Sequence, residues 1–212
     1  MTDLFETAVT TADYSAKDIE VLEGLEPVRL RPGMYVGGTD ERALHHLVSE
    51  VFDNSMDEAV AGHATRIEIA MNIDGSITIA DNGRGIPVDP HPKHKDKSAL
   101  EVIFTTLHSG GKFNSKVYET SGGLHGVGIS VVNALSEWTN VEVARDKKLW
   151  TQNFSRGKAT GKITNNGSTP NRRGTKVTFL PDHEIFGIGN TTFKPSILYE
   201  LSRSKAYLFK GI

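Results

Sequence analysis

The strongest constraint on the fold is a long amphipathic helix, which the sequence predicts from Arg42 to Ala61. Apolar side chains recur along it at the helical period, so they lie on one stripe. The stripe comprises Leu44, Leu47, Val48, Val51, Phe52, Met56 and Ala59. Gly62, a residue type that often ends helices, follows directly. One side of this helix therefore needs a core, and the other side is left for solvent or a ligand.

The segments around this helix predict both strands and further helices. Residues 65–73 and 76–81 interleave apolar and polar side chains around an Asp-Gly pair, which indicates a β-hairpin. Ser98 and Glu101 form a capping-box pattern at the start of an expected helix over 98–108. Helices are also expected at 17–25, just before a turn at 31–35, at 129–138 and at 195–209. Further strands are expected at 141–146, 148–155, 161–166 and 174–181, and the HPKH segment at 91–94 is expected to be a loop.

This order of elements predicts an α/β two-layer sandwich, with a mixed, largely antiparallel sheet and helices on one face. Residues 1–15 are polar, rich in threonine and without sustained periodicity, so they are expected to form a mobile arm before a domain over 16–212. The final residues, KGI, carry no capping pattern, and we expect the sequence to be a fragment of a longer protein that continues into further domains.

Composition excludes several functional classes. The chain has no cysteine, which rules out disulfides and thiol chemistry and weakens any zinc hypothesis. Its net charge of −2 gives no broad attraction for nucleic acid or an anionic membrane, so such contacts would be local. There is no signal peptide or membrane-spanning run, and we expect a soluble, cytoplasmic protein. The basic segments NRRGTK and SRSKAYLFK could contact DNA or a neighbouring domain, or could simply be solvated surface.

The polar side of the long helix is unusually acidic. Glu50, Asp53, Asp57 and Glu58 surround Asn54, although like charges at helical spacing repel each other. One interpretation is an ordinary solvated face. The other is a cation site, because an asparagine carbonyl is a ligand that magnesium accepts when phosphates supply most of the negative charge. In that case Glu50, one turn earlier, could deprotonate a water molecule near the ion.

Three further segments support a nucleotide site. DNGRGIP (81–87) follows a strand directly; it is either an Asn-Gly turn or a base pocket in which the Asp81 carboxylate accepts a hydrogen bond from an amino group. HSGGKF (108–113) places Lys112 after two glycines, in either a surface loop or a lid. SGGLHGVG (121–128) leads into an expected helix, so it is either a linker or a group of backbone N–H donors for an anion. No Walker-type phosphate loop occurs. Together these segments predict one pocket for Mg²⁺ and a nucleoside triphosphate.

Four segments, in this order and spacing, resemble the ATPase domain of bacterial type II topoisomerase B subunits: EVFDNSMDEA, DNGRGIP, LHSGGKF and SGGLHGVGISVVNALS. These subunits are members of the GHKL superfamily, which has the Bergerat ATP-binding fold. The resemblance extends from about Tyr14 to the end of the chain. SMDEAVAGHA and GLHGVGISVVNALS favour the topoisomerase IV B subunit over the gyrase B subunit. The resemblance implies an ATP-dependent enzyme that uses Mg²⁺ and closes a DNA gate through ATP-driven dimerisation.

The resemblance also implies a role for individual residues. Glu50 matches the general base and Asn54 the magnesium ligand. Asp81 matches the carboxylate that reads adenine, with Thr175 sharing a water molecule there. The remaining positions match parts of the same pocket: Arg84 pairs with Glu58; Gly85, Ile86 and Pro87 line the base pocket; Lys112 and Tyr118 belong to the lid; Gly123, Leu124, His125, Gly126, Val127, Gly128 and Ile129 wrap the phosphates; Arg145 lies at the rim used by aminocoumarin-type inhibitors; and Tyr14 reaches the ATP site of a second copy.

The resemblance implies partners as well: a second copy held by the N-terminal arm when nucleotide is bound, a topoisomerase A-type subunit, and duplex DNA at the nucleoid. The family also uses a lysine from a following transducer domain, so we expect this chain to bind ATP but to hydrolyse it poorly. Two rival functions stay open. A histidine-kinase-type phosphotransferase would not need Glu50 to activate water, and a pure binding module would dimerise with ATP without any chemistry.

Overall fold

The computed structural model describes residues 22–109, 126–187, 189, 191–209 and 211–212. Its main sheet contains the strands β1 (Ile67–Met71), β2 (Ile77–Asp81), β5 (Ser136–Arg145), β6 (Lys148–Ser155), β7 (Lys158–Ala159), β8 (Thr164–Ser168) and β9 (Gly174–Pro181). The strand order is β1-β2-β9-β5-β6-β7, with β8 also paired to β6. All of these described pairs are antiparallel, so the sheet is antiparallel rather than mixed.

The last strand in sequence joins the two halves of the sheet. β9 lies between β2 and β5, with Val177 opposite both Ile79 and Val141. The hairpin β1–β2 turns at Asp74 and Gly75, as the Asp-Gly pair predicts, and the Gly75 amide donates to the Asn72 carbonyl at 3.1 Å. Because β2 and β9 are antiparallel neighbours, the end of β2 lies beside the start of β9. Residues near positions 81 and 175 are thereby brought together.

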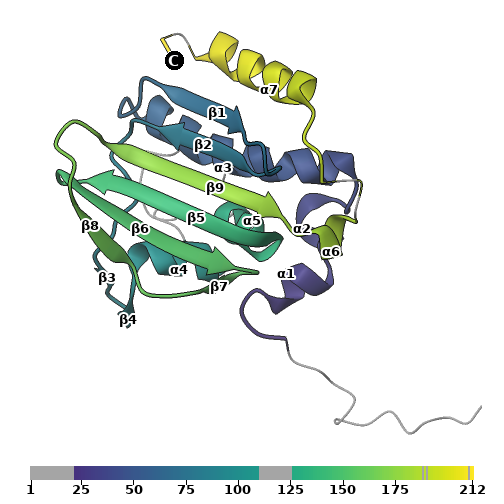
Figure 1. Cartoon of the computed structure of the whole chain (residues 1–212), viewed down its shortest axis with the longest axis horizontal. Coiled ribbons are helices and arrows are strands. Elements are labelled where there is room, and N and C mark those ends of the chain that lie inside the picture. Colours follow the sequence, from purple (N-terminus) through teal and green to yellow (C-terminus); the bar gives the residue numbers. More distant parts are fainter. Residues whose placement is uncertain (1–21, 110–125, 188, 190, 210) are drawn as a thin grey trace, which may run out of the picture.

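The helices that cover the sheet lie on one of its faces, as the sequence predicts. The helices are α1 (Glu26–Leu30), α2 (Gly33–Val36), α3 (Glu41–Val60), α4 (Ala99–Thr105), α5 (Gly128–Ala134), α6 (His183–Phe186) and α7 (Pro195–Leu208). Figure 1 shows α3, α4 and α5 together behind the sheet, while α7 lies beyond its β1 edge. The α/β two-layer fold is therefore confirmed.

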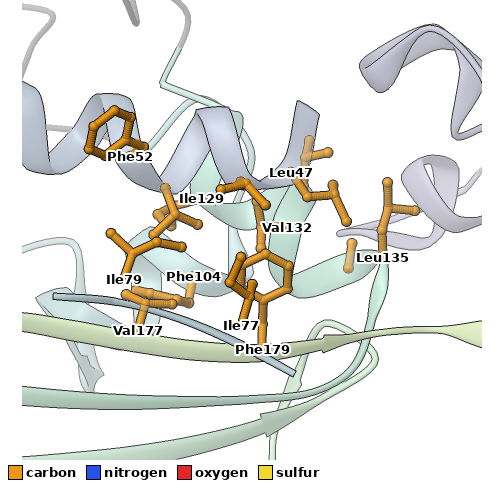
Figure 2. Close-up of a cluster of buried hydrophobic side chains, with 14 of the residues drawn as sticks. Leu47, Phe52, Ile77, Ile79, Phe104, Ile129, Val132, Leu135, Val177 and Phe179 are labelled. Carbon is orange, nitrogen blue, oxygen red and sulfur yellow. The ribbon is translucent and has the colours of Figure 1, made fainter. Parts of the chain in front are cut away.

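The amphipathic stripe of α3 forms the centre of the core. Six of the seven predicted stripe residues are buried, and Ala59, nearest the end of the helix, is half-buried. Figure 2 shows Leu47 and Phe52 of α3 above Ile77, Ile79 and Phe179 of the sheet. α3 begins after Asp40, whose Oδ1 accepts a hydrogen bond from the Ala43 amide at 2.9 Å. Burial of one side of α3 therefore fixes which residues of its other side face outward from this core.

Some predicted elements differ from the structure. The helix expected over 129–138 ends at Ala134, and Ser136 already belongs to β5, because pairing with β9 there outweighs the helical pattern. The 31–35 turn contains α2, and the loop at 91–94 is a hairpin of β3 (Pro90–His91) and β4 (His94–Ser98). β7 and α6 were not predicted. The arm over 1–15 and most of the helix expected at 17–25 lie outside the described residues.

A buried carboxylate directly after β9 holds α1 and, through Arg29, the end of α5. Asp182 is fully buried, and its Oδ2 accepts from Arg29 Nη2 at 2.7 Å and from Arg156 Nε at 2.9 Å. The second nitrogen of the Arg29 guanidinium donates to the Ala134 carbonyl at 2.7 Å, at the end of α5. Burial opposes ionisation of Asp182, but hydrogen bonds from Arg29 and Glu184 and the charges of both arginines lower its pKa below the usual value. The ionised carboxylate therefore stabilises the folded chain.

We predict that Asp182→Asn lowers the free energy of unfolding by about 2–3 kcal/mol at neutral pH, somewhat below the usual cost of breaking a fully buried ion pair because both arginines are partly exposed. A lowered folded-state pKa stabilises the protein above the ordinary aspartate pKa, and this contribution is lost as pH falls. Urea unfolding across pH should therefore show the two proteins converging in acid. Glu184→Gln, which removes only an exposed partner of Arg156, is the control and should change stability little. A pH-independent difference would contradict the prediction.

Candidate functional site

A cavity of about 630 Å³ lies between the polar side of α3, the turn after β2 and the start of α5. Every predicted site residue within the described part of the chain lines it: Glu50, Asn54, Glu58, Asp81, Arg84, Gly85, Ile86, Pro87, Gly126, Val127, Gly128, Ile129, Arg145 and Thr175. Positions 54 and 126, which come from opposite flanks, thus border one space. Six further predicted residues lie outside the described part of the chain: Tyr14, Lys112, Tyr118, Gly123, Leu124 and His125.

The α3 wall of the cavity presents Glu50 and Asn54 in defined orientations. The Asn54 amide nitrogen donates to the Glu50 carbonyl at 2.7 Å, which directs the side-chain carbonyl oxygen away from the helix backbone. His46, one turn before Glu50, lies with Nε2 3.3 Å from Glu50 Oε1. The carboxylate of Glu50 also packs against the first residue of α5. A Cβ built on Gly128 would lie 1.8 Å from Glu50 Oε2, so only glycine leaves room for it there.

Asp81, at the end of β2, is held by hydrogen bonds from three different elements. Its Oδ1 accepts from the Gly83 amide at 2.8 Å and from the Thr175 amide at 3.3 Å, and its Oδ2 accepts from Ser55 Oγ at 3.2 Å. Burial raises the pKa of Asp81, and these three bonds offset that effect only in part. A buried carboxylate with a defined set of donors is suited to recognising one further hydrogen-bond donor.

Two arginines shape the rim of the cavity. Arg84 donates to Glu58 through Nε at 3.1 Å and Nη2 at 2.7 Å, and its backbone amide donates to the same carboxylate at 2.9 Å. Burial disfavours the charged form of Glu58, but the contacts with Arg84 outweigh it and lower the pKa of this carboxyl. Arg145 Nη1 donates to the Gly85 carbonyl at 2.7 Å, and the Ile86 amide donates to Thr175 Oγ1 at 3.1 Å. These bonds fix the DNGRGIP turn against β5 and β9.

The close approach of β9 to β2 depends on Gly174. Its φ is +106°, in the region that favours glycine, and a Cβ added there would lie 2.0 Å from the Asp81 carbonyl oxygen. Any side chain at this position would therefore push the two strands apart at the point where Thr175 donates to Asp81. The backbone at position 174 is in this way part of the site, although glycine offers no functional group of its own.

Among the described residues, the cavity has no metal site built from protein side chains alone. In this part of the chain, no group of three or more histidine, cysteine, aspartate or glutamate side chains could hold a metal ion. Asn54 supplies one neutral oxygen, which suits an ion that takes its other ligands from phosphates and water, as Mg²⁺ does. The donor set therefore fits magnesium brought with a nucleotide, and fits zinc poorly.

Several cavity residues were not singled out from the sequence, and two of them, His46 and Ser55, contact predicted site residues. His46 precedes Glu50 by four residues, so helical spacing is a signal that could have found it. Ser55 is adjacent to Asn54 but turns toward β2, and nothing in its local sequence indicates that contact with Asp81.

Among the described residues, no helix is both long and apolar enough to cross a membrane.

Comparison with known proteins places the chain among nucleotide-binding proteins. Residues 39–185 match the family described as "Histidine kinase-, DNA gyrase B-, and HSP90-like ATPase". The B subunit of DNA topoisomerase 4 from Caulobacter vibrioides is 64% identical over 98% of this chain and 30% of its own length. The B subunit of DNA gyrase from Thermotoga maritima is 55% identical over 94% of this chain and 31% of its own length. The chain thus spans about a third of the length of these curated relatives.

A solved structure shares the fold. The crystal structure of the 43K ATPase domain of Thermus thermophilus gyrase B in complex with an aminocoumarin superposes with a TM-score of 0.77. It is 50% identical to this chain and covers 88% of it, and the match covers 46% of that protein. The antiparallel sheet with helices on one face is therefore the architecture of a solved ATPase domain.

We predict that Gly174→Ala lowers the free energy of unfolding by at least about 3 kcal/mol, because both the positive φ and the clash with Asp81 oppose alanine. Gly161→Ala is the matched control, since nothing lies within 4 Å of a Cβ there, and it should shift stability by less than about 0.5 kcal/mol. Urea unfolding of both variants measures the difference. Equal midpoints for the two variants would show that β9 can move away from β2 at little cost.

Proposed function

Because this chain belongs to the family of histidine kinase-, DNA gyrase B- and HSP90-like ATPases, we propose that it is the ATP-binding and ATP-hydrolysing domain of a bacterial type II DNA topoisomerase, in a B subunit of the topoisomerase IV kind. The observation that carries the proposal is the convergence of Glu50 and Asn54 with Asp81 and with residues 126–128 on one cavity. Its volume of about 630 Å³ lies within the range of ligand pockets.

The base of the nucleotide would bind at the β2 end of the cavity. Asp81 would accept a hydrogen bond from the exocyclic amine of adenine, and Thr175 would share a water molecule at this end. Ile86 and Pro87 would contact the faces of the ring, since both line the cavity beside Asp81. Guanine carries a carbonyl where adenine carries this amine, so an ionised Asp81 would face an acceptor and disfavour it.

Hydrolysis would take place at the α3 end. Glu50 would accept a proton from a water molecule whose oxygen attacks the γ-phosphorus, while the bond to the β-phosphate breaks and ADP leaves. His46 would orient the Glu50 carboxylate, 3.3 Å away. Asn54 would hold Mg²⁺ brought with ATP, an ion that offsets phosphate charge. Backbone amides at 126–128, together with positions 123–125 and the lid residues Lys112 and Tyr118, would surround the phosphates.

The partners follow from the same proposal. ATP binding would bring two copies together through residues 1–15, with Tyr14 reaching the neighbouring ATP site, and the dimer would close around duplex DNA alongside an A-type subunit. An aminocoumarin-type inhibitor would compete with ATP near Arg145, in keeping with the aminocoumarin in the Thermus gyrase B structure. The protein would act in the cytoplasm at the nucleoid, and a transducer domain of the longer protein would complete efficient hydrolysis.

Two substitutions separate binding from chemistry. We predict that Glu50→Ala slows ATP turnover about 10²–10⁴-fold, the usual contribution of a general base, while the magnesium complex of a non-hydrolysable ATP analogue still binds. Asp81→Asn should instead weaken binding by about 1.5–3 kcal/mol, because the charged acceptor is lost. Calorimetry measures binding, and phosphate release with the chain in excess over ATP measures turnover.

The reverse pattern would exchange the two roles. If the unmodified chain did not bind the analogue at all, the proposed function itself would be wrong. Transfer of phosphate to a protein histidine, rather than to water, would point to a phosphotransferase. Binding and dimerisation without phosphate release, even in the longer protein, would indicate a pure binding module.

The contact between α5 and Glu50 gives an independent test of the base. Gly128→Ala adds a methyl group where Glu50 Oε2 lies, and alanine is otherwise well tolerated at the start of a helix. We predict that stability changes little while turnover falls by at least about tenfold, because the displaced carboxylate no longer reaches the attacking water. Gly161→Ala serves as control in the phosphate-release assay. Unchanged turnover in Gly128→Ala would contradict the assignment of Glu50 as base.

A further inference from the structure

Ser55 makes an unusual contact for a serine inside a helix. It is buried, with 5% of its surface exposed, and its Oγ donates to Asp81 Oδ2 at 3.2 Å across the interface between α3 and β2. A serine hydroxyl carries a single proton, so this bond uses it. The hydroxyl therefore donates to a residue 26 positions away rather than to a carbonyl of its own helix.

Three other helical serines in the described residues behave differently. Ser49 of α3 donates to the His45 carbonyl at 3.4 Å, four residues earlier. Ser202 and Ser204 of α7 donate to the carbonyls of Leu198 and Glu200 at 2.8 and 2.7 Å. Such back-bonding is the usual local option for a serine in a helix interior. Ser55 instead lies where the Asp81 carboxylate is within reach, which indicates that its hydroxyl acts on the site.

The bond from Ser55 is also the one side-chain bond among the three that Asp81 receives in the described structure. Oδ1 accepts two backbone amides, from Gly83 and Thr175, while Oδ2 accepts Ser55. An ionised carboxylate oxygen can accept two hydrogen bonds, so Oδ2 keeps capacity for one more donor. The Ser55 contact is thus the one bond that holds Oδ2 directly, while the two amides hold Oδ1, and it leaves one acceptor position of Oδ2 for a ligand.

We propose that Ser55 is a positioning residue for base specificity: its hydroxyl holds Asp81 Oδ2 in the orientation that accepts the exocyclic amine of adenine. This inference rests on the proposed function, since it concerns the same cavity. Burial raises the pKa of Asp81 and the neighbouring Glu58 charge acts in the same direction, whereas the Ser55 bond opposes both. The hydroxyl thus favours the ionised carboxylate, which can only accept, over the protonated form, which would present its own donor to the amine.

The test compares two ligands that differ only in the amine. The probes are the β,γ-imido triphosphates of adenosine and of purine riboside, which lacks the 6-amino group, titrated with magnesium into the 212-residue chain by calorimetry. Ser55→Ala removes the hydroxyl and keeps the volume close to that of serine. Ser49→Ala on the same helix is the matched control, because its hydroxyl only back-bonds and the residue does not line the cavity. Thermal melts of each variant report folding.

We expect Ser55→Ala to weaken binding of the adenosine compound about three- to tenfold, the contribution of one hydrogen bond, and to leave the purine riboside compound within about twofold. Ser49→Ala should change neither. Equal weakening of both compounds would make Ser55 a general structural residue and overturn the inference, and so would unchanged binding of both. If the unmodified chain bound neither compound, the proposed function would fail too, which is a different result from loss of discrimination alone.

Discussion

The burial of one side of α3 against the sheet is the constraint on which the rest of the structure depends. Leu47 and Phe52 pack toward Ile77, Ile79 and Phe179 in one core cluster, which fixes the rotation of the helix about its axis. A shift of one residue would turn the helix by about 100° and carry the apolar stripe away from the sheet. Because the apolar stripe is held in place, Glu50 and Asn54 are directed into the cavity. The core therefore sets the geometry of the site without contributing a functional group.

The order of the strands supplies the opposite wall. β9 comes last in the sheet but lies between β2 and β5, so the end of β2 meets the start of β9. Asp81 consequently receives donors from three segments that differ in their place in the fold: Ser55 on α3, Gly83 in the following turn and Thr175 on β9. The bonds from Ser55 and Thr175 cannot form until helix and strands are packed. The Asp81 end of the cavity is for this reason a product of the tertiary fold rather than of any one motif.

Periodicity and turn chemistry predicted the elements whose local sequence agrees with their tertiary setting. α3, the β1–β2 hairpin, the Ser98 cap (its Oγ accepts from the Glu101 amide at 3.0 Å) and α7 are of this kind. The end of α5 was misplaced because residues 136–138 have helical spacing but pair with β9. The resemblance to type II topoisomerase ATPase domains implied many of the residues that line the cavity. Neither the resemblance nor the local sequence predicted the Ser55–Asp81 contact, which depends on the distance between α3 and β2.

The acidic side of α3 raises the question of how a cavity with so many carboxylates could accept a triphosphate. The sequence alone suggested that the whole face awaits a cation. The structure adds that three of the four carboxylates already lie beside a basic side chain of the protein. Arg84 forms two side-chain hydrogen bonds with Glu58, Lys205 of α7 lies with Nζ 2.6 Å from Asp53 Oδ1, and His46 adjoins Glu50. Pairing of this kind reduces the repulsion toward an anion. Under the proposed function, Asn54 would then supply the one neutral oxygen ligand on the protein side, and a phosphate-bound magnesium ion would not need to neutralise the helix.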